Sequence, residues 1–391
     1  MLSSSLIGKA KSLNSKSAFI HFMLFKPPKQ QCQQDLGEKG IDGGLWRTSE
    51  FYAYFTIIFW SCISLITTAY NFSSSEHPAY EKYSHLLSKG WLIPWRLFDD
   101  SDPQWGGFRH NLPKLTALLS IYTLAYRIQN SVLRVLLTLV AIFLLHGTNV
   151  IKIMAIVVPC YYFSTLKQRY LGPGLTWIFV IASLFVTEWY TWDFSQVSPM
   201  LSILDNFTGF YKRWNIIFKI SCLRIISFSL DHYWSHTNKV GSESHEEIGY
   251  RSRIQGNFMQ IEDYTFFNYI SYVFFLPLYF AGPIITFNDF MFQLKNRNSP
   301  FDYRSALKYF ARLVGCFLLL ELTLNLFHPV AIKQTKAFTS FSSLDFGILA
   351  FLNLKIIWLK LLVIWRYFRL FALLNQIDPP ENMVRTMHVI F

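Results

Sequence analysis

The stretch Tyr269–Gln293, YISYVFFLPLYFAGPIITFNDFMFQ, decides the fold. It begins as an apolar run, breaks at Gly282-Pro283 and resumes with Asn288 and Asp289. Pro283 has no backbone N–H, so a carbonyl one turn earlier loses its helical partner. In lipid such a freed group is costly unless protein or a water-filled cavity satisfies it. The pattern therefore predicts a broken membrane helix whose polar continuation lines a cavity or a re-entrant turn.

Composition supports a membrane protein. Of 391 residues, 52% are hydrophobic, 18% aromatic and 15% charged, whereas a soluble chain carries about 25% charged residues. The formal net charge of +12 comes from basic residues that flank apolar runs, which suits anionic lipid headgroups. The sequence contains no recognisable RNA- or DNA-binding module, so we expect membrane lipids, and not nucleic acid, as partners.

The apolar runs predict an all-α polytopic membrane protein with eight or nine segments. Only the first run, Phe51–Tyr70, is a clean spanning helix by length, because about 20 apolar residues cross a bilayer. The others are expected to be tilted, bundled or re-entrant. Residues 71–111 and 232–263 are expected to be polar loops. The further segments lie at about 112–126, 135–146, 153–166, 171–187, 216–230, 266–280, 313–327 and 346–365.

Ionisable residues inside these segments are candidate functional residues, because their burial is expensive. Arg224 and Asp231 lie two helical turns apart in LRIISFSLD, on roughly one face. A guanidinium there could contact a phosphate, but we favour an internal ion pair that joins helices. Glu321, alone in LLLELTL, must face a partner or a cavity, and structural pairing is the favoured alternative.

One late helix combines Lys355, Trp358 and Lys360 with Arg366 and Arg369. Bases that extend to the membrane interface are the default interpretation, and a phosphate-binding site is the alternative.

His146 closes the run LLHGTN and is a candidate general base, although a capping role at a helix end is favoured. His232 and His236 have a metal-compatible spacing but lack a third convincing ligand. The five cysteines are scattered, so we predict no metal site.

Several phrases in order along the chain carry a family resemblance. Together with FAGPI and the following Asn-Asp pair, they resemble the membrane-bound O-acyltransferase (MBOAT) family. Within it they are similar to the fungal Gup subfamily of glycerol-uptake and GPI-anchor-remodelling proteins, which is related to hedgehog acyltransferase. The phrases are LWRTSEF (45–51), YEKYSHLLSKGW (80–91), DDSDPQW (99–105), HGTN (146–149), LRIISFSLD (223–231), NLKIIWLKLLVIWRYFRLFALL (353–374) and DPPENM (378–383).

The resemblance implies a helical bundle with re-entrant segments around a tunnel through the membrane. It implies transfer of an acyl group from the co-substrate acyl-CoA to a lipid hydroxyl, with lyso-GPI as the acceptor and no bound cofactor. A histidine would act as general base in a desolvated site. The endoplasmic reticulum membrane is the expected location, with the plasma membrane as a second. The candidate tunnel residues are Arg224, Asp231, Gly282, Pro283, Asn288, Asp289, Glu321, Lys355, Trp358 and Lys360.

This chain departs from the subfamily pattern after DPPENM. There the pattern places a polar residue in a Trp-rich segment and then the catalytic histidine, whereas eight residues follow Met383 here and His388 has no Trp-rich context. We therefore expect a basic tail at residues 1–50, an incomplete membrane domain at 51–391, and no acyl transfer by this chain alone. Segments 266–280 and 346–365 would then have uncovered apolar faces.

Two alternatives come from other functional classes. One is a glycerol or polyol uptake transporter or regulator, and the other is a non-catalytic membrane remnant. A secondary transporter often contains inverted repeats with broken helices in both halves. The sequence shows one strong break, at Gly282-Pro283, which favours the acyltransferase hypothesis.

Overall fold

The structure is a computed structural model that describes residues 48–126, 131–166, 171–189, 193–211, 213–236, 254, 259–297 and 303–381. The predicted basic tail lies almost entirely outside these ranges. The chain divides into two compact units, Met1–Leu65 and Ile66–Phe391. Helix α2 (Ser49–Phe72) runs from the first unit into the second, and its apolar side chains, such as Ile57 and Trp60, are exposed. That exposure is expected of a helix whose surroundings are lipid.

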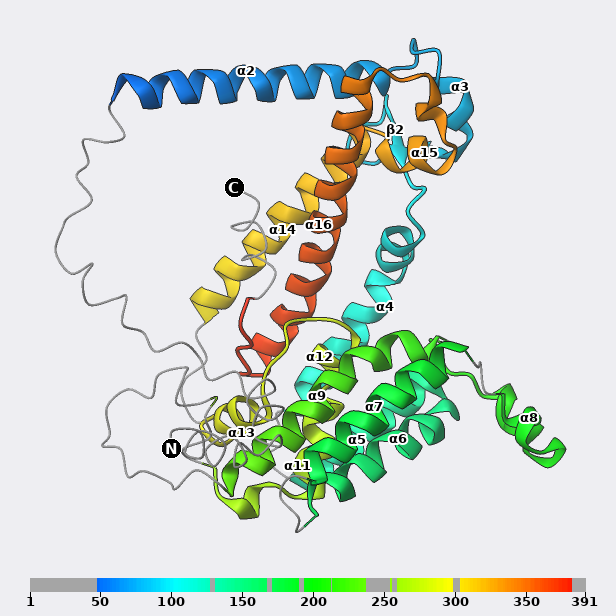
Figure 1. Cartoon of the computed structure of the whole chain (residues 1–391), viewed down its shortest axis with the longest axis vertical. Coiled ribbons are helices and arrows are strands. Elements are labelled where there is room, and N and C mark those ends of the chain that lie inside the picture. Colours follow the sequence, from blue (N-terminus) through cyan, green and yellow to red (C-terminus); the bar gives the residue numbers. More distant parts are fainter. Residues whose placement is uncertain are drawn as a thin grey trace, which may run out of the picture. The chain divides into compact units, whose positions relative to one another are not determined.

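The described part of the larger unit is helical apart from one two-stranded hairpin (Figure 1). Its elements after α2 are α3 (Tyr80–Tyr83), η2 (Ser84–Leu86), β1 (Leu87–Lys89), β2 (Leu97–Asp99), α4 (Pro103–Tyr126), α5 (Ser131–His146), α6 (Asn149–Ser164), α7 (Leu171–Trp189), α8 (Phe194–Val197), η3 (Pro199–Asn206), α9 (Trp214–Ser235), η4 (Ile261–Asp263), α11 (Phe266–Val273), α12 (Leu276–Phe280), α13 (Phe287–Lys295), α14 (Tyr303–Leu326), α15 (Pro329–Gln334), η5 (Ala337–Ser340) and α16 (Ser343–Leu374).

Two groups of helices form the core of this unit. In the first, α6, α7 and α9 pack on one another, and α5 packs on α4, α6 and α11. In the second, the long helices α14 and α16 pair, and α16 also contacts α4 (Figure 1). Helix α12 contacts α4, α5, α9 and α16. The broken segment therefore joins the two groups.

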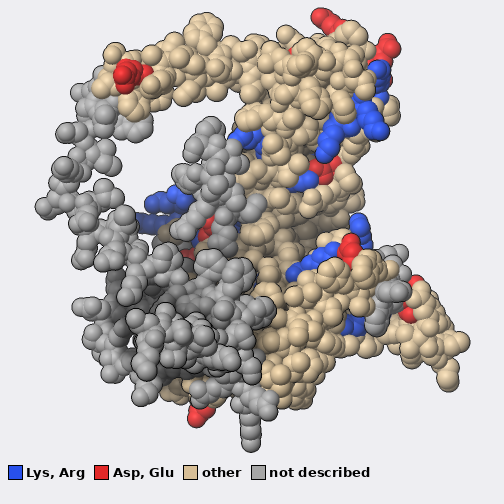
Figure 2. All heavy atoms as spheres, in the orientation of Figure 1, with Lys and Arg blue, Asp and Glu red and all other residues tan. Residues whose placement is uncertain are grey.

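Four of the described helices are long and apolar enough to cross a membrane: α2, α7, α14 and α16. The expectation of a single clean span was wrong. The helices continue past the apolar runs, so that α14 begins ten residues before the predicted segment and α16 continues through its charged residues. In the view of Figure 2, uncharged residues cover most of the described surface, which suits a protein in lipid.

Residues 71–111 do not form the single polar loop that was predicted from the sequence. Strands β1 and β2 pair antiparallel, with Ser88 opposite Phe98, and α4 already begins at Pro103. The buried Asp99 carboxylate then accepts the amides of Val330 and Ala331, both at 3.0 Å, at the start of α15. This carboxylate satisfies amide groups that the helix itself leaves without partners.

The expectation that segment 266–280 has an uncovered face was wrong for residues 269–279, whereas Phe267 is 53% exposed. Every side chain from Tyr269 to Tyr279 is buried, and α11 packs against α5, α9 and α13. Helix α16 does expose one apolar face, with Phe346, Leu354 and Ile357 on it.

Candidate functional site

The segment 269–293 is broken at two places. Helix α11 ends at Val273, and the short α12 begins at Leu276 with Pro277 in its first turn. The second break, between α12 and α13, contains Gly282-Pro283, as predicted. Proline in a helix interior removes a donor and clashes with the preceding turn, so each break falls beside one.

Arg224 of α9 donates to backbone carbonyls beside both breaks, and one of them, that of Val273, has no i+4 amide donor because residue 277 is proline. Its guanidinium donates to the carbonyl oxygens of Val273 at 3.1 Å and Tyr272 at 3.5 Å, and to that of Leu278. The side chain is 1% exposed. The favoured internal ion pair was therefore wrong for Arg224, whose guanidinium joins α9 to backbone carbonyls of the broken segment. A guanidinium has several donors in a fixed fork, which suits it to bridge two half-helices.

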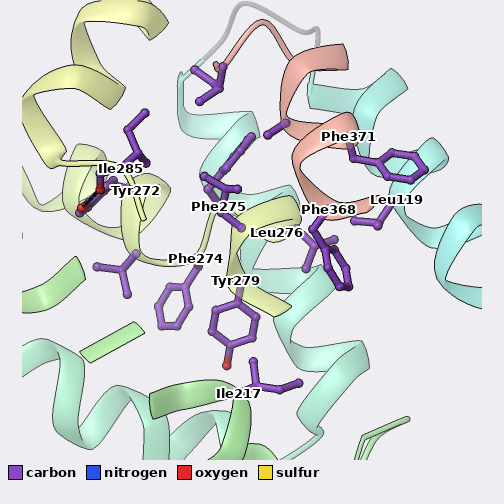
Figure 3. Packing of buried hydrophobic residues seen from close by; sticks show 14 of the residues in the cluster. Leu119, Ile217, Tyr272, Phe274, Phe275, Leu276, Tyr279, Ile285, Phe368 and Phe371 are labelled. Carbon is purple, nitrogen blue, oxygen red and sulfur yellow. Dashed lines mark hydrogen bonds between the residues drawn. The ribbon is translucent and has the colours of Figure 1, made fainter. Parts of the chain in front are cut away.

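Gly282 and Pro283 are packed inside the protein. Gly282 has a φ of +142°, a conformation that favours glycine. A Cβ atom there would lie 3.1 Å from Leu278 Cδ2 and 3.6 Å from Phe368 Cβ. Figure 3 shows the break from close by, with Phe274 and Tyr279 directed towards Ile217 of α9. The backbone thus passes closely between α12 and α16.

Asp231 holds the start of α13. Its Oδ2 atom accepts the amide of Asn288 at 3.1 Å, and Ser227 Oγ lies 3.5 Å from it. The Asn288 side chain accepts the Tyr264 hydroxyl at 2.6 Å. Asp231 and Asn288 are each 1% exposed. A carboxylate at a helix N-terminus is stabilised by the amide groups and the helix dipole.

Asp289 begins a chain of contacts that reaches the DPPENM motif. Its Oδ1 atom accepts Gln293 Nε2 at 2.9 Å. Gln293 Oε1 accepts the amide of Asp378 at 2.5 Å, and Gln293 Nε2 donates to the Asp378 carbonyl at 3.2 Å. Arg369 of α16 binds the same turn through Asp378 Oδ1 at 2.6 Å and the Pro379 carbonyl at 2.7 Å. Two motifs that are far apart in sequence therefore form one polar site.

His146 ends α5 and is completely buried. Its Nδ1 lies 3.3 Å from the Tyr211 carbonyl oxygen, and its Nε2 lies 3.0 Å from the Tyr279 hydroxyl. A carbonyl can only accept, so Nδ1 carries the proton and Nε2 accepts from Tyr279. Both nitrogens have partners, which suits a positioning role for His146 better than that of a base.

Glu321 is the centre of a second polar cluster, between α4 and α14. Its carboxylate accepts Trp91 Nε1 at 2.5 Å, Trp105 Nε1 at 2.9 Å and Arg109 at 3.3 Å. Arg109 also pairs with Asp100 at 2.8 Å. Glu321 is 0% exposed. Glu321 thus has the structural partners that its burial requires.

Lys360 does not extend to the interface, so the default interpretation was wrong for it. Its ammonium pairs with Asp102 at 2.5 Å, and both side chains are about nine-tenths buried. Asp102 also accepts the amides of Gln104 at 2.9 Å and Trp105 at 3.0 Å, which caps α4. Lys355 and Trp358 are half-buried, and the Lys355 ammonium lies 5.1 Å from the centre of the Phe351 ring.

Asp102 should make the stability of the folded protein depend on pH. Burial raises the pKa of Asp102, but its hydrogen bonds from Lys360 and from two backbone amides outweigh burial and hold the pKa below its ordinary 3.8. Because the folded-state pKa is the lower one, this stabilisation is present above 3.8 and lost as the pH falls through the folded-state value. In detergent, the melting temperatures of wild type and Asp102→Asn should differ near neutral pH and converge in acid. A difference that is constant with pH would contradict the assignment.

The structure therefore places eight of the ten predicted tunnel residues in two clusters. Arg224, Asp231, Asn288 and Asp289 surround the broken segment with Gly282 and Pro283. Glu321 and Lys360 belong to the cluster at the start of α4, whereas Lys355 and Trp358 are half-buried on α16. Within the described ranges, no group of three His, Cys, Asp or Glu side chains is arranged to hold a metal.

Sequence reasoning missed the polar partners of these residues: Asp102, Trp105, Arg109, Tyr264 and Gln293. The sequence contains a signal for Asp102. In DDSDPQW, Asp102 stands just before Pro103, and an acidic residue followed by proline is a helix start signal. The motif therefore also marks the start of α4, which lies at Pro103.

The fold and these clusters define a multi-pass helical membrane protein with buried polar sites between its helices. Comparison with known sequences is more specific. The profile of the MBOAT, membrane-bound O-acyltransferase family, matches residues 165–389. The chain belongs to this family.

Three curated relatives are similar in sequence to this chain over most of its length. Membrane-bound O-acyltransferase gup1 of Schizosaccharomyces pombe is 34% identical over 368 residues, which cover 86% of this chain and 62% of the relative. GUP1 of Candida tropicalis is 37% identical over 364 residues, with 88% and 61% coverage. GUP1 of Saccharomyces cerevisiae is 36% identical over 362 residues, with 87% and 64% coverage. The chain thus spans about three fifths of the length of these relatives.

Proposed function

We propose that this protein takes part in O-acyl transfer from acyl-CoA to a lipid hydroxyl. The observation that carries the proposal is the family match over residues 165–389, which contains the whole broken segment and the DPPENM motif. The buried contacts among α9, α13 and residue 378 support it, because they hold this region in one arrangement. A rigid, dry scaffold is what a desolvated acyl-transfer site requires.

The acceptor is proposed to be a lyso-GPI lipid, and the location to be the endoplasmic reticulum membrane, with the plasma membrane as a second. The similarity to Gup proteins supports both. The general base is proposed to come from the part of the relatives that this chain does not match. His146 is not proposed for that role, because its Nε2 already accepts a hydrogen bond from Tyr279. Residues 1–391 alone are then expected to be inactive.

A chimera tests the proposal. Residues 48–381 would replace the corresponding part of the Saccharomyces cerevisiae relative, and the chimera would be expressed in cells that lack that relative. We expect restored acyl chains on GPI-anchored proteins, measured by lipid mass spectrometry, and no restoration by residues 1–391 alone. Removing a general base typically costs about 10²–10⁴-fold in rate.

Two results would contradict the proposal. One is a stable, membrane-integrated chimera that leaves the anchor lipids unrestored. The other is restored uptake of radiolabelled glycerol by residues 1–391 alone, which would favour the transporter alternative. Restoration of anchor lipids by residues 1–391 alone would move the base into this chain, and His146→Gln would then be the first variant to assay.

A further inference from the structure

The connection between α7 and α9 exposes a set of large apolar side chains. It contains α8 and η3, and Figure 1 shows α8 projecting from the ends of the neighbouring helices. We call five of its side chains the apolar tip. They are Val197, Met200, Ile203, Phe207 and Phe210, which are 71%, 89%, 64%, 61% and 82% exposed.

The base of this connection is fixed to the turn between α5 and α6 by backbone hydrogen bonds. The amide of Thr148 donates to the Phe207 carbonyl at 2.9 Å. In return, the amides of Phe210 and Tyr211 donate to the carbonyls of Leu144 at 3.1 Å and Leu145 at 2.8 Å. The apolar tip is therefore held out by a defined structure.

Two glycines make this close approach possible. Gly147 and Gly209 have φ values of +57° and +64°, in the left-handed region. A Cβ atom on Gly147 would overlap the Phe207 carbonyl oxygen, and one on Gly209 would lie 2.5 Å from the amide nitrogen of Gly147. The backbones meet so closely that no other residue fits at either position.

The side chain of Asp205 binds the start of α8 within this connection. Its carboxylate accepts the amides of Phe194 and Ser195, both at 2.9 Å. In a 3₁₀-helix, residues three apart lie on one line. Met200 and Ile203 therefore share one line of η3, which ends at Asn206, whereas Ser202 lies on the line of Asp205. The element has an apolar side and a polar side.

The apolar tip follows a candidate membrane span in the sequence. Helix α7 is one of the candidate spans, and its last turns expose Phe185 by 56% and Trp189 by 74%. Tryptophan is enriched where helices leave the membrane. Lys152, whose ammonium lies 4.4 Å from the centre of the Phe194 ring, also interacts with the carboxylates of Asp193 and Asp205 in the same connection. In Figure 2 the projecting region is almost entirely uncharged.

From these contacts we infer that residues 194–210 form an interfacial anchor that inserts Met200, Ile203 and Phe207 into the acyl boundary of the bilayer beside α7. An amphipathic element with apolar side chains on one side and polar groups on the other is suited to lie in the plane of the interface. The occupant of this surface is lipid, and neither a second copy of the chain nor another protein is required.

Spin labels can test this placement. Single cysteines at Met200, Ile203 and Ser202, in a chain whose five native cysteines are replaced, would carry a nitroxide in nanodiscs of phosphatidylcholine with a minority of phosphatidylserine. We expect labels at 200 and 203 to be relaxed more by oxygen, which concentrates in lipid, than by a water-soluble nickel chelate. The Ser202→Cys label, on the polar side of the same helix, should show the reverse.

Two outcomes would overturn the inference. If the nickel chelate relaxes the labels at 200 and 203 more than oxygen does, as expected for the label at 202, the whole element lies in water. Labels protected from both reagents would mean that protein covers the apolar tip. Should the cysteine-free chain fail to fold, a ketone-bearing unnatural amino acid at the same three positions can carry the nitroxide in the wild-type background.

Discussion

Replacing Arg224 by methionine is expected to destabilise the larger unit by roughly 3 kcal/mol or more, because a buried acceptor without a partner costs about 1–3 kcal/mol. The variant removes the donor to the carbonyls of Tyr272, Val273 and Leu278 at once. Methionine keeps much of the apolar stem, so the loss reports on the guanidinium. Thermal unfolding in detergent, followed by size-exclusion chromatography, measures the effect.

Two further variants make the Arg224 test specific. Arg224→Lys retains one charged group but lacks the fork that reaches both half-helices, so it should lie between wild type and methionine. Lys219→Met in the same helix removes an exposed pair with Glu188 and should change little. Equal melting temperatures for Arg224→Met and Lys219→Met would show that the carbonyls do not depend on Arg224.

Replacing Glu321 by alanine should cost about 3–5 kcal/mol, as removing one partner of a buried charged pair does. The variant leaves Arg109 and the indole N–H groups of Trp91 and Trp105 without their shared acceptor. It also removes one of the contacts between α14 and the start of α4, another of which is the Trp105–Phe317 ring contact. We expect a large fall in melting temperature and in the yield of monodisperse protein.

Glu321→Gln is the matched control, because it keeps the size and one acceptor oxygen but not the charge. One indole can still be satisfied, so this variant should be less destabilised than alanine. If the two variants unfold at the same temperature, the charge itself, and not the number of acceptors, dominates. If neither differs from wild type, the cluster contributes nothing to stability.

The sequence predicted features that depend on local backbone chemistry. The break at Gly282-Pro283 follows from a missing N–H and from a glycine with positive φ, so it could be found without knowledge of packing. The helix end at His146 and most apolar segments followed for similar reasons. The MBOAT family could be recognised from the sequence as well, because the resemblance rests on short phrases in a fixed order.

Features that depend on distant partners could not be predicted. A lysine in an apolar helix has the same sequence pattern whether it extends to the interface or pairs with Asp102, which lies 258 residues away. The hairpin was missed because strands of three residues are too short to show an alternating pattern. Arg224 and Asp231 do lie on one helix, but α11 and α12 bind the first and α13 binds the second.

The contacts of Arg224 also constrain the order in which the chain enters the membrane. Arg224 is synthesised with α9, whereas its carbonyl partners follow 48 to 54 residues later. A guanidinium without partners is expensive in lipid, and α11 and α12 have only 8 and 5 residues, too few to span a bilayer. We therefore expect α9 to stay at the insertion machinery until Leu278 has emerged, and to enter the membrane together with α11 and α12.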